Sequence, residues 1–196
     1  MIRILIMTLM ITGMSMSVDA QSMSKKYKTV IAEQLINAPA ELVWEAMVLD
    51  YGEISNFSPY IYASSYESGS LKGELNAERK CDFNAKGTRW THEKIVEIDQ
   101  DNMIMKNVVV DAQKFPLNTD NSFAYYRVKD NGDGTSTASY EFRYRTKPGI
   151  MTGLVKGKFQ KTLDDTLVGL KHYVETGEVV NAASGNWKEV KAEYAN

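Results

Sequence analysis

Residues 149–177 read GIMTGLVKGKFQKTLDDTLVGLKHYVETG and carry the strongest secondary-structure signal of the chain. Apolar side chains recur in it at intervals of three and four residues, with lysine and aspartate between them. That spacing predicts one long amphipathic helix, because positions three and four apart share a helix face. Pro148 precedes the stretch and Gly177 ends it, as expected at helix boundaries. The apolar positions are Met151, Val155, Phe159, Leu163, Leu167, Leu170 and Val174.

The segments before this helix have the pattern of an antiparallel sheet. They are rich in Tyr, Val, Ile, Phe and Thr, which favour strands, and short turns containing Gly, Asn and Asp join many of them. Short turns connect antiparallel neighbours. Because the long helix needs a broad apolar partner, we expect a seven-stranded antiparallel sheet curled around it. The expected strands are residues 27–37, 60–68, 74–83, 88–98, 103–112, 121–129 and 136–147.

Two short helices are expected directly after the first strand, which makes the fold class α+β. Residues 37–41 read NAPAE, a helix start with proline in the first turn and glutamate at the positive helix end. Val43, Trp44, Met47 and Val48 form the apolar stripe of the first helix. Residues 50–52, with the sequence DYG, end it, and a second short helix is expected around residues 53–57.

The two ends of the chain differ from this domain. Residues 1–20 contain a basic start at Arg3, an apolar run over residues 4–11 that is too short to span a bilayer, and small residues before Ala20. We predict a signal peptide cleaved after Ala20 and a protein exported to the periplasm or secreted; an uncleaved anchor or a disordered tail is the alternative. The domain is assigned to residues 21–178, and residues 179–196 to an irregular C-terminal tail.

Composition excludes several classes of function. The chain has 196 residues, is 43% hydrophobic and carries a formal net charge of −2, so a basic nucleic-acid surface is not expected. The single Cys81 cannot form an internal disulfide and is predicted to be a small buried side chain. His92 and His172 lie far apart, without metal-ligand spacing. We expect no metal, and no nucleotide cofactor because no phosphate-binding glycine loop or dinucleotide fingerprint is present.

Several local motifs occur in an order that resembles a known superfamily. They are INAPAELVW at residues 36–44, DYG at 50–52, FSP at 57–59, GELNAERKC at 73–81, the strand over 87–99, FPL at 115–117, NGDGT at 131–135 and KPG at 147–149. The chain is similar in residues 27–177 to START-like proteins of the SRPBCC superfamily, especially the polyketide cyclase/dehydrase and lipid transport type. The resemblance implies the helix-grip fold, with a cavity between sheet and helix that holds lipids, steroids, plant hormones or polyketides.

Aromatic side chains are the first candidates to line such a cavity. In the last strand Ala138, Tyr140, Phe142 and Tyr144 alternate with polar residues, so this set is expected to face the helix at Phe159 and Leu163. Trp90 in the fourth strand and Phe115 in a loop complete the apolar candidates. The alternative is that these rings only fill the core.

Arg79 and Glu93 are the polar candidates. The resemblance places both near the pocket mouth, where a charged group can orient a ligand carboxylate or hydroxyl. Glu93 and Trp90 alternate along one strand, so a bulge would be needed for both to point inward. The alternative is an Arg and a Glu exposed on the outside of the sheet.

Three functions are compatible with these patterns. The leading hypothesis is an exported, non-catalytic binder or carrier of a small hydrophobic molecule. The second is a cyclase or dehydratase that uses Arg79, Glu93, His92 or a tyrosine hydroxyl for proton transfer. The third is an interaction module whose cavity is filled by its own side chains.

Overall fold

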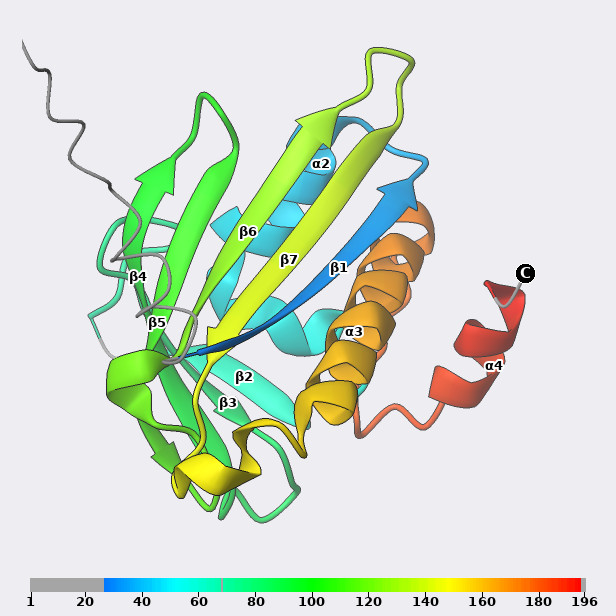
Figure 1. Ribbon diagram of the computed structural model, residues 1–196. Helices are drawn as coiled ribbons and strands as arrows, with labels where there is room; N and C mark the ends of the chain where they lie inside the picture. Colours follow the sequence, from blue (N-terminus) through cyan, green and yellow to red (C-terminus); the bar gives the residue numbers. More distant parts are fainter. Residues whose placement is uncertain (1–26, 68, 195–196) are drawn as a thin grey trace, which may run out of the picture.

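A computed structural model describes residues 27–67 and 69–194, and shows one sheet wrapped around one long helix (Figure 1). The sheet has seven strands in the order β1-β7-β6-β5-β4-β3-β2, and every neighbouring pair is antiparallel, which confirms the predicted topology. The predicted signal peptide lies outside the described residues. The strands are β1 Lys28–Ile36, β2 Ala63–Tyr66, β3 Glu78–Asp82, β4 Trp90–Asp99, β5 Ile104–Gln113, β6 Phe123–Asp130 and β7 Ser136–Tyr144.

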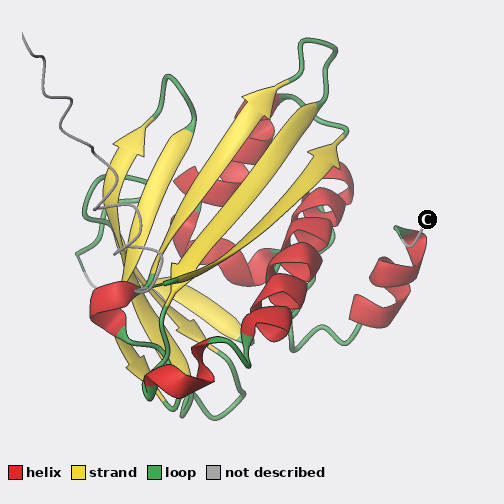
Figure 2. Cartoon of the chain, in the orientation of Figure 1, coloured by secondary structure: helices red, strands yellow, loops and turns green. Residues whose placement is uncertain are grey.

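The long helix α3 spans Lys156–Thr176 and packs its apolar side on the sheet. Leu163, Leu167 and Leu170 of the predicted stripe are buried, and Gly177 closes the helix with a φ of 77°, in the left-handed region that glycine tolerates. Burial of this stripe against β1 and β7 is what orders the helix, because propensity alone supplies little stability. Figure 2 shows α3 as the longest helix, running alongside β1.

The predicted start of this helix at Gly149 is wrong. A separate 3-10 turn, η4, covers Gly149–Thr152, and α3 begins only at Lys156. Hydrogen bonds hold η4 to the end of β7: the Tyr144 hydroxyl donates to the Thr152 carbonyl at 2.9 Å, and the Thr146 amide donates to the Thr152 hydroxyl at 3.1 Å. These tertiary contacts fix the turn separately from α3.

Short helical segments follow β1, as predicted: α2 Ala40–Trp44, the π-helical η1 Glu45–Leu49 and the 3-10 helix η2 Tyr51–Asn56. Val43, Trp44, Met47 and Val48 are buried, which confirms the predicted apolar stripe. A further 3-10 turn, η3 Thr119–Asn121, lies between β5 and β6. The segments that directly follow β1 pack against the sheet and α3 and contribute buried side chains to the core.

Alternation along β4 decides which of its side chains point inward. Thr91 and Ile95 are buried, and the pairing with β5 shifts between His92 and Glu93 and again between Ile95 and Glu97. Such bulges bend a strand and increase its twist, which helps the sheet to curve. The shift at Glu93 leaves the alternation within β4 intact, so Glu93 shares the inner face with Thr91 and Ile95.

The irregular C-terminal tail predicted for residues 179–196 is wrong, because the helix α4 spans Trp187–Glu193. The Val180 amide donates to the Asn56 carbonyl at 2.8 Å, and Val180 and Val190 are both buried. Lys191 Nζ lies 2.5 Å from Asp165 Oδ1 on α3. The segment is therefore docked on the domain. Among the described residues, no helix is both long enough and apolar enough to cross a membrane.

Candidate functional site

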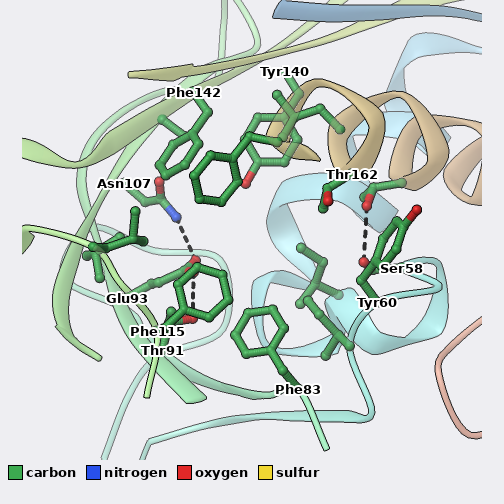
Figure 3. Close-up of a pocket in the computed structure, with 18 of the residues that line it drawn as sticks. Ser58, Tyr60, Phe83, Thr91, Glu93, Asn107, Phe115, Tyr140, Phe142 and Thr162 are labelled. Carbon is green, nitrogen blue, oxygen red and sulfur yellow. Dashed lines mark hydrogen bonds between the residues drawn. The ribbon is translucent and has the colours of Figure 1, made fainter. Parts of the chain in front are cut away.

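A cavity lies between the inner face of the sheet and α3 (Figure 3). The space that protein atoms leave empty is about 670 Å³, a volume that includes the solvent at the open mouth of the cavity. Strands, loops and α3 all contribute walls, and most of the lining is apolar or aromatic, as in small-molecule sites. The apolar lining consists of Ile54, Ile61, Phe83, Val109, Phe115, Leu117, Ala124, Phe142, Phe159 and Leu163.

An aromatic cluster joins the sheet to the helix at this cavity. The ring of Phe159 on α3 lies 5.4 Å from Phe142, 4.6 Å from Tyr144 and 6.3 Å from Phe115, centroid to centroid. Phe115 in turn lies 4.6 Å from Phe83. Edge and tilted contacts of this kind favour a fixed arrangement of rings. Phe83, Phe115 and Phe159 remain partly exposed, so they present apolar surface to the cavity.

The cavity also has a polar wall, organised by Arg79. Its Nε and Nη2 donate to Glu93 Oε2 at 3.1 and 2.7 Å, and Nη1 donates to the Tyr51 carbonyl at 2.9 Å. Nη2 also donates to the Tyr126 hydroxyl at 2.9 Å, and the guanidinium carbon lies 4.0 Å from the Tyr51 ring centroid. The side chain is 1% exposed. A buried charge persists only with such partners.

Glu93 borders the cavity next to this guanidinium. Besides Arg79, it accepts hydrogen bonds from Asn107 Nδ2 at 2.9 Å and from Thr91 Oγ1 at 2.9 Å. Its side chain is 14% exposed against 1% for Arg79. Both residues line the cavity, and the carboxylate is the more exposed of the two charged groups.

Two tyrosines extend the wall. The Tyr126 hydroxyl donates to the Tyr140 hydroxyl at 2.7 Å. Burial raises the pKa of Tyr126 to about 12, although the Arg79 charge opposes the shift. Burial, followed by the proximity of Tyr126 and Glu93, also raises the pKa of Tyr140 well above its usual value. Both phenols consequently keep their protons at neutral pH.

The charge of Arg79 is equally fixed. Burial by itself lowers the pKa of the guanidinium, but its interactions with Tyr126, Glu93 and Tyr51 outweigh this effect and raise the pKa well above its usual value. The Arg79–Glu93 pair is thus an ionic support inside the domain. The alternative drawn from the sequence, in which Arg79 and Glu93 are exposed on the outside of the sheet, is wrong.

A family model described as polyketide cyclase / dehydrase and lipid transport matches residues 28–175. The chain belongs to this family. The match begins at the first residue of β1 and ends within the last turn of α3, so it includes every element that lines the cavity. No curated protein sequence matches the chain.

Solved structures share the helix-grip fold described above, a seven-stranded antiparallel sheet curled around one long helix. XoxI from Bacillus cereus is 18% identical, with a TM-score of 0.61 over 76% of this chain and 96% of that chain. TTHA0849 from Thermus thermophilus is 17% identical, with a TM-score of 0.61 over 76% and 99%. Ara h 8.0201 is 17% identical, with a TM-score of 0.59 over 76% and 99%. These similarities establish the fold.

The structure brings most of the predicted site residues together in the cavity of this family member. The predicted residues that line it are Arg79, Glu93, Phe115, Tyr140, Phe142, Phe159 and Leu163. Figure 3 shows Tyr140 and Phe142 on one wall, Glu93 and Asn107 beside them, and Phe83 across the cavity. Whether they contact a ligand stays a prediction.

Two predicted residues lie outside the lining. Trp90 follows the alternation of β4 to the outer face, where its Nε1 donates to Gln113 Oε1 at 2.7 Å and Lys80 Nζ lies 5.7 Å from its ring. Tyr144 faces inward as expected, but it is fully buried behind Phe142 and Phe159. Placing either side chain at the cavity surface was therefore an error.

Other polar residues of the site were missed. Tyr126 is two residues from Ala124 and from Val128 on β6 and shares their inward face, so strand alternation could have identified it as inward-facing. Asn107 shares the inward face of β5 with Met105 and Val109 in the same way. Tyr51 lies in a helix-breaking segment and had no sequence signal that would have placed it against Arg79.

The remaining reactive groups do not join the site. His92 Nε2 lies 2.8 Å from Glu78 Oε2, and His92 is not part of the cavity lining. Cys81 is buried, as predicted, and burial raises its pKa to about 12. Within residues 27–67 and 69–194, no group of three or more His, Cys, Asp or Glu side chains could hold a metal ion.

Proposed function

We propose that this protein binds a small hydrophobic molecule in the cavity between the sheet and α3. The observation that carries the proposal is the combination of an aromatic lining with a single polar wall whose charges are already paired. An apolar ligand gains about 25 cal/mol for each Å² of apolar surface it buries there. The family and the fold support the same function.

The polar wall favours binding over catalysis. Arg79 directs its N–H groups to Glu93, Tyr51 and Tyr126, and the Glu93 carboxylate accepts from Arg79, Asn107 and Thr91. A general base needs a lone pair within reach of the substrate proton, and these hydrogen bonds occupy the carboxylate. His92, considered as a base, lies outside the cavity lining.

Turnover remains the second candidate, because the Tyr140 hydroxyl and Glu93 both border the cavity. A cyclase or dehydratase would use the phenol as a proton donor. Incubation with model poly-ketone substrates separates the two functions: the binder leaves them unchanged, whereas an enzyme converts them and loses that conversion in Tyr140→Phe.

We also propose that the molecule is lipid-, sterol- or polyketide-like and that the protein is exported. The signal-peptide pattern of residues 1–20 supports export. Intact-mass measurement of the protein from the envelope of its host tests this directly, since export with cleavage after Ala20 gives a mature chain beginning at Gln21. A full-length mass in the cytoplasmic fraction would contradict it.

Native mass spectrometry of the same preparation, followed by organic extraction, tests ligand binding. The expected result is an added mass that denaturation releases. A panel of lipids, sterols and polyketides should then stabilise the protein, by about 2.7 kcal/mol at a hundredfold excess over Kd. An apo mass together with no stabilisation across the panel would overturn the proposal.

A variant with a plugged cavity tests where the ligand binds, and a substitution on the outer face of the same strand is its matched control. Ala124 lines the cavity and is buried, so Ala124→Leu fills space that a ligand would occupy. Tyr125, the next residue of β6, points to the opposite face of the sheet, where it contacts Arg127. We expect Ala124→Leu to abolish ligand-induced stabilisation and Tyr125→Leu to retain it.

A further inference from the structure

The hydrogen bonds of the polar wall run in one direction. A guanidinium has only donors, so the Tyr126 hydroxyl accepts from Arg79 Nη2 at 2.9 Å. Tyr126 then donates its own proton to the Tyr140 hydroxyl at 2.7 Å. The Tyr140 oxygen is therefore already an acceptor, and the Tyr140 proton must point away from Tyr126.

That proton is directed toward the cavity. Tyr140 lines the cavity, and Figure 3 shows its ring on the cavity wall. Among the described residues, the hydrogen bonds of the structure include no acceptor for the Tyr140 proton. A buried phenol without an acceptor loses the free energy of a hydrogen bond, so a ligand that supplies one is favoured.

Most other hydroxyls at the cavity are engaged within the protein. Ser58 Oγ and Thr166 Oγ1 pair with each other at 3.1 Å, so one of the two donates and the other keeps its proton; both lie away from the Arg79 cluster (Figure 3). Tyr60 donates to Asp165, Thr162 Oγ1 donates to the Lys158 carbonyl at 2.9 Å, and Thr91 donates to Glu93. Tyr140 is thus the hydroxyl donor that the polar wall offers to a ligand.

The charge of the wall decides which acceptor fits. Glu93 borders the cavity, whereas Arg79 is 1% exposed and donates to protein groups. Arg79 also lines the cavity, but its Nε and Nη2 donate to Glu93 and Tyr126. A carboxylate bound beside Tyr140 would therefore lie next to the negative charge of Glu93, and like charges at short distance repel. A carbonyl oxygen accepts the phenolic proton and carries no net charge.

We propose that Tyr140 determines ligand specificity by donating a hydrogen bond to an uncharged carbonyl oxygen, so that the cavity selects apolar ketones or esters over fatty acids and hydrocarbons. This inference rests on the proposed function, because it requires that the cavity bind an apolar molecule.

Three probes of equal chain length test it: 2-undecanone, undecanoate at alkaline pH and undecane, each competing with a fluorescent apolar dye. Tyr140→Phe should weaken the binding of 2-undecanone about tenfold, which corresponds to about 1.4 kcal/mol, while undecane binds as before. Tyr144→Phe is the matched control: this buried phenol on the same strand face donates to Thr152 and should leave the preference unchanged.

Infrared spectroscopy of ¹³C-carbonyl 2-undecanone detects the hydrogen bond itself, because the carbonyl stretch would not shift if Tyr140 only supported the structure of the cavity. The carbonyl stretch of the bound ketone should lie lower in the wild-type protein than in Tyr140→Phe. An equal effect of Tyr140→Phe on the affinities for undecane and 2-undecanone would overturn the inference while leaving hydrophobic binding intact. Tighter binding of undecanoate would overturn the selection of an uncharged group. Failure of all three probes to bind would overturn both the inference and the proposed function.

Discussion

Replacing Arg79 by methionine tests whether the buried ion pair supports the cavity wall. Arg79→Met keeps a long apolar stem and removes the donors to Glu93, the Tyr51 carbonyl and Tyr126. Glu93 then carries an uncompensated charge at 14% side-chain exposure, with Asn107 and Thr91 as its remaining donors. Breaking a buried pair in this way costs about 3–5 kcal/mol.

That loss is a large part of the stability of a domain, which is about 5–15 kcal/mol. In a urea titration followed by circular dichroism, with a slope of about 2 kcal/mol per molar urea, the midpoint should fall by roughly 2 M. Arg127→Met is the matched control, since Arg127 pairs with Glu141 at 3.2 Å and is 37% exposed. Its cost should stay below about 1 kcal/mol.

A further measurement decides whether the uncompensated charge is the cause. In the Arg79→Met protein, Glu93→Gln should restore part of the lost stability, by about 0.5–3 kcal/mol of coupling. A penalty that is equal for Arg79→Met and Arg127→Met, or that Glu93→Gln increases, would refute this reasoning.

The other predictions concern packing and burial. In Gly169→Ala the new Cβ would lie 2.2 Å from the Phe57 carbonyl oxygen, so the free energy of unfolding should drop by about 1–3 kcal/mol. In Gly157→Ala the new Cβ meets nothing within 4 Å, so the free energy of unfolding should rise by about 0.5–1 kcal/mol. Burial raises the pKa of Tyr126 to about 12, so the folded state holds this proton longer and stability should fall as pH rises from about 10; Tyr126→Phe should flatten that decline. Cys81, whose pKa burial raises to about 12, should react with Ellman's reagent only after denaturation.

Some features of this protein were predictable because they repeat along the chain. Leu163, Leu167 and Leu170 recur at helical spacing, and that period is enough to identify α3. The alternation of Tyr140, Phe142 and Tyr144 likewise identifies the inner face of β7, although it does not reveal that Tyr144 lies behind the cavity surface.

Features without a repeat were missed. Helix α4 contributes one buried side chain, Val190, so its sequence shows no apolar period. The start of α3 depends on the hydrogen bonds that Thr152 makes with Tyr144 and Thr146, residues whose contact the local sequence does not reveal. Trp90 was predicted to face inward because it is a large aromatic side chain. It is next to the inward-facing Thr91 in β4, so it points to the outer face.

The sequence by itself determined the architecture, because amphipathic periods and turn residues act locally and each strand or helix carries its own signal. It also supplied the aromatic side chains of the cavity. Only the tertiary structure decided that Arg79 is buried, since an isolated arginine in a strand is ordinarily exposed. The buried guanidinium of Arg79 is stabilised by hydrogen bonds to Tyr51, Glu93 and Tyr126, which lie on three separate elements. Contacts between residues so far apart in the chain leave no local sequence pattern.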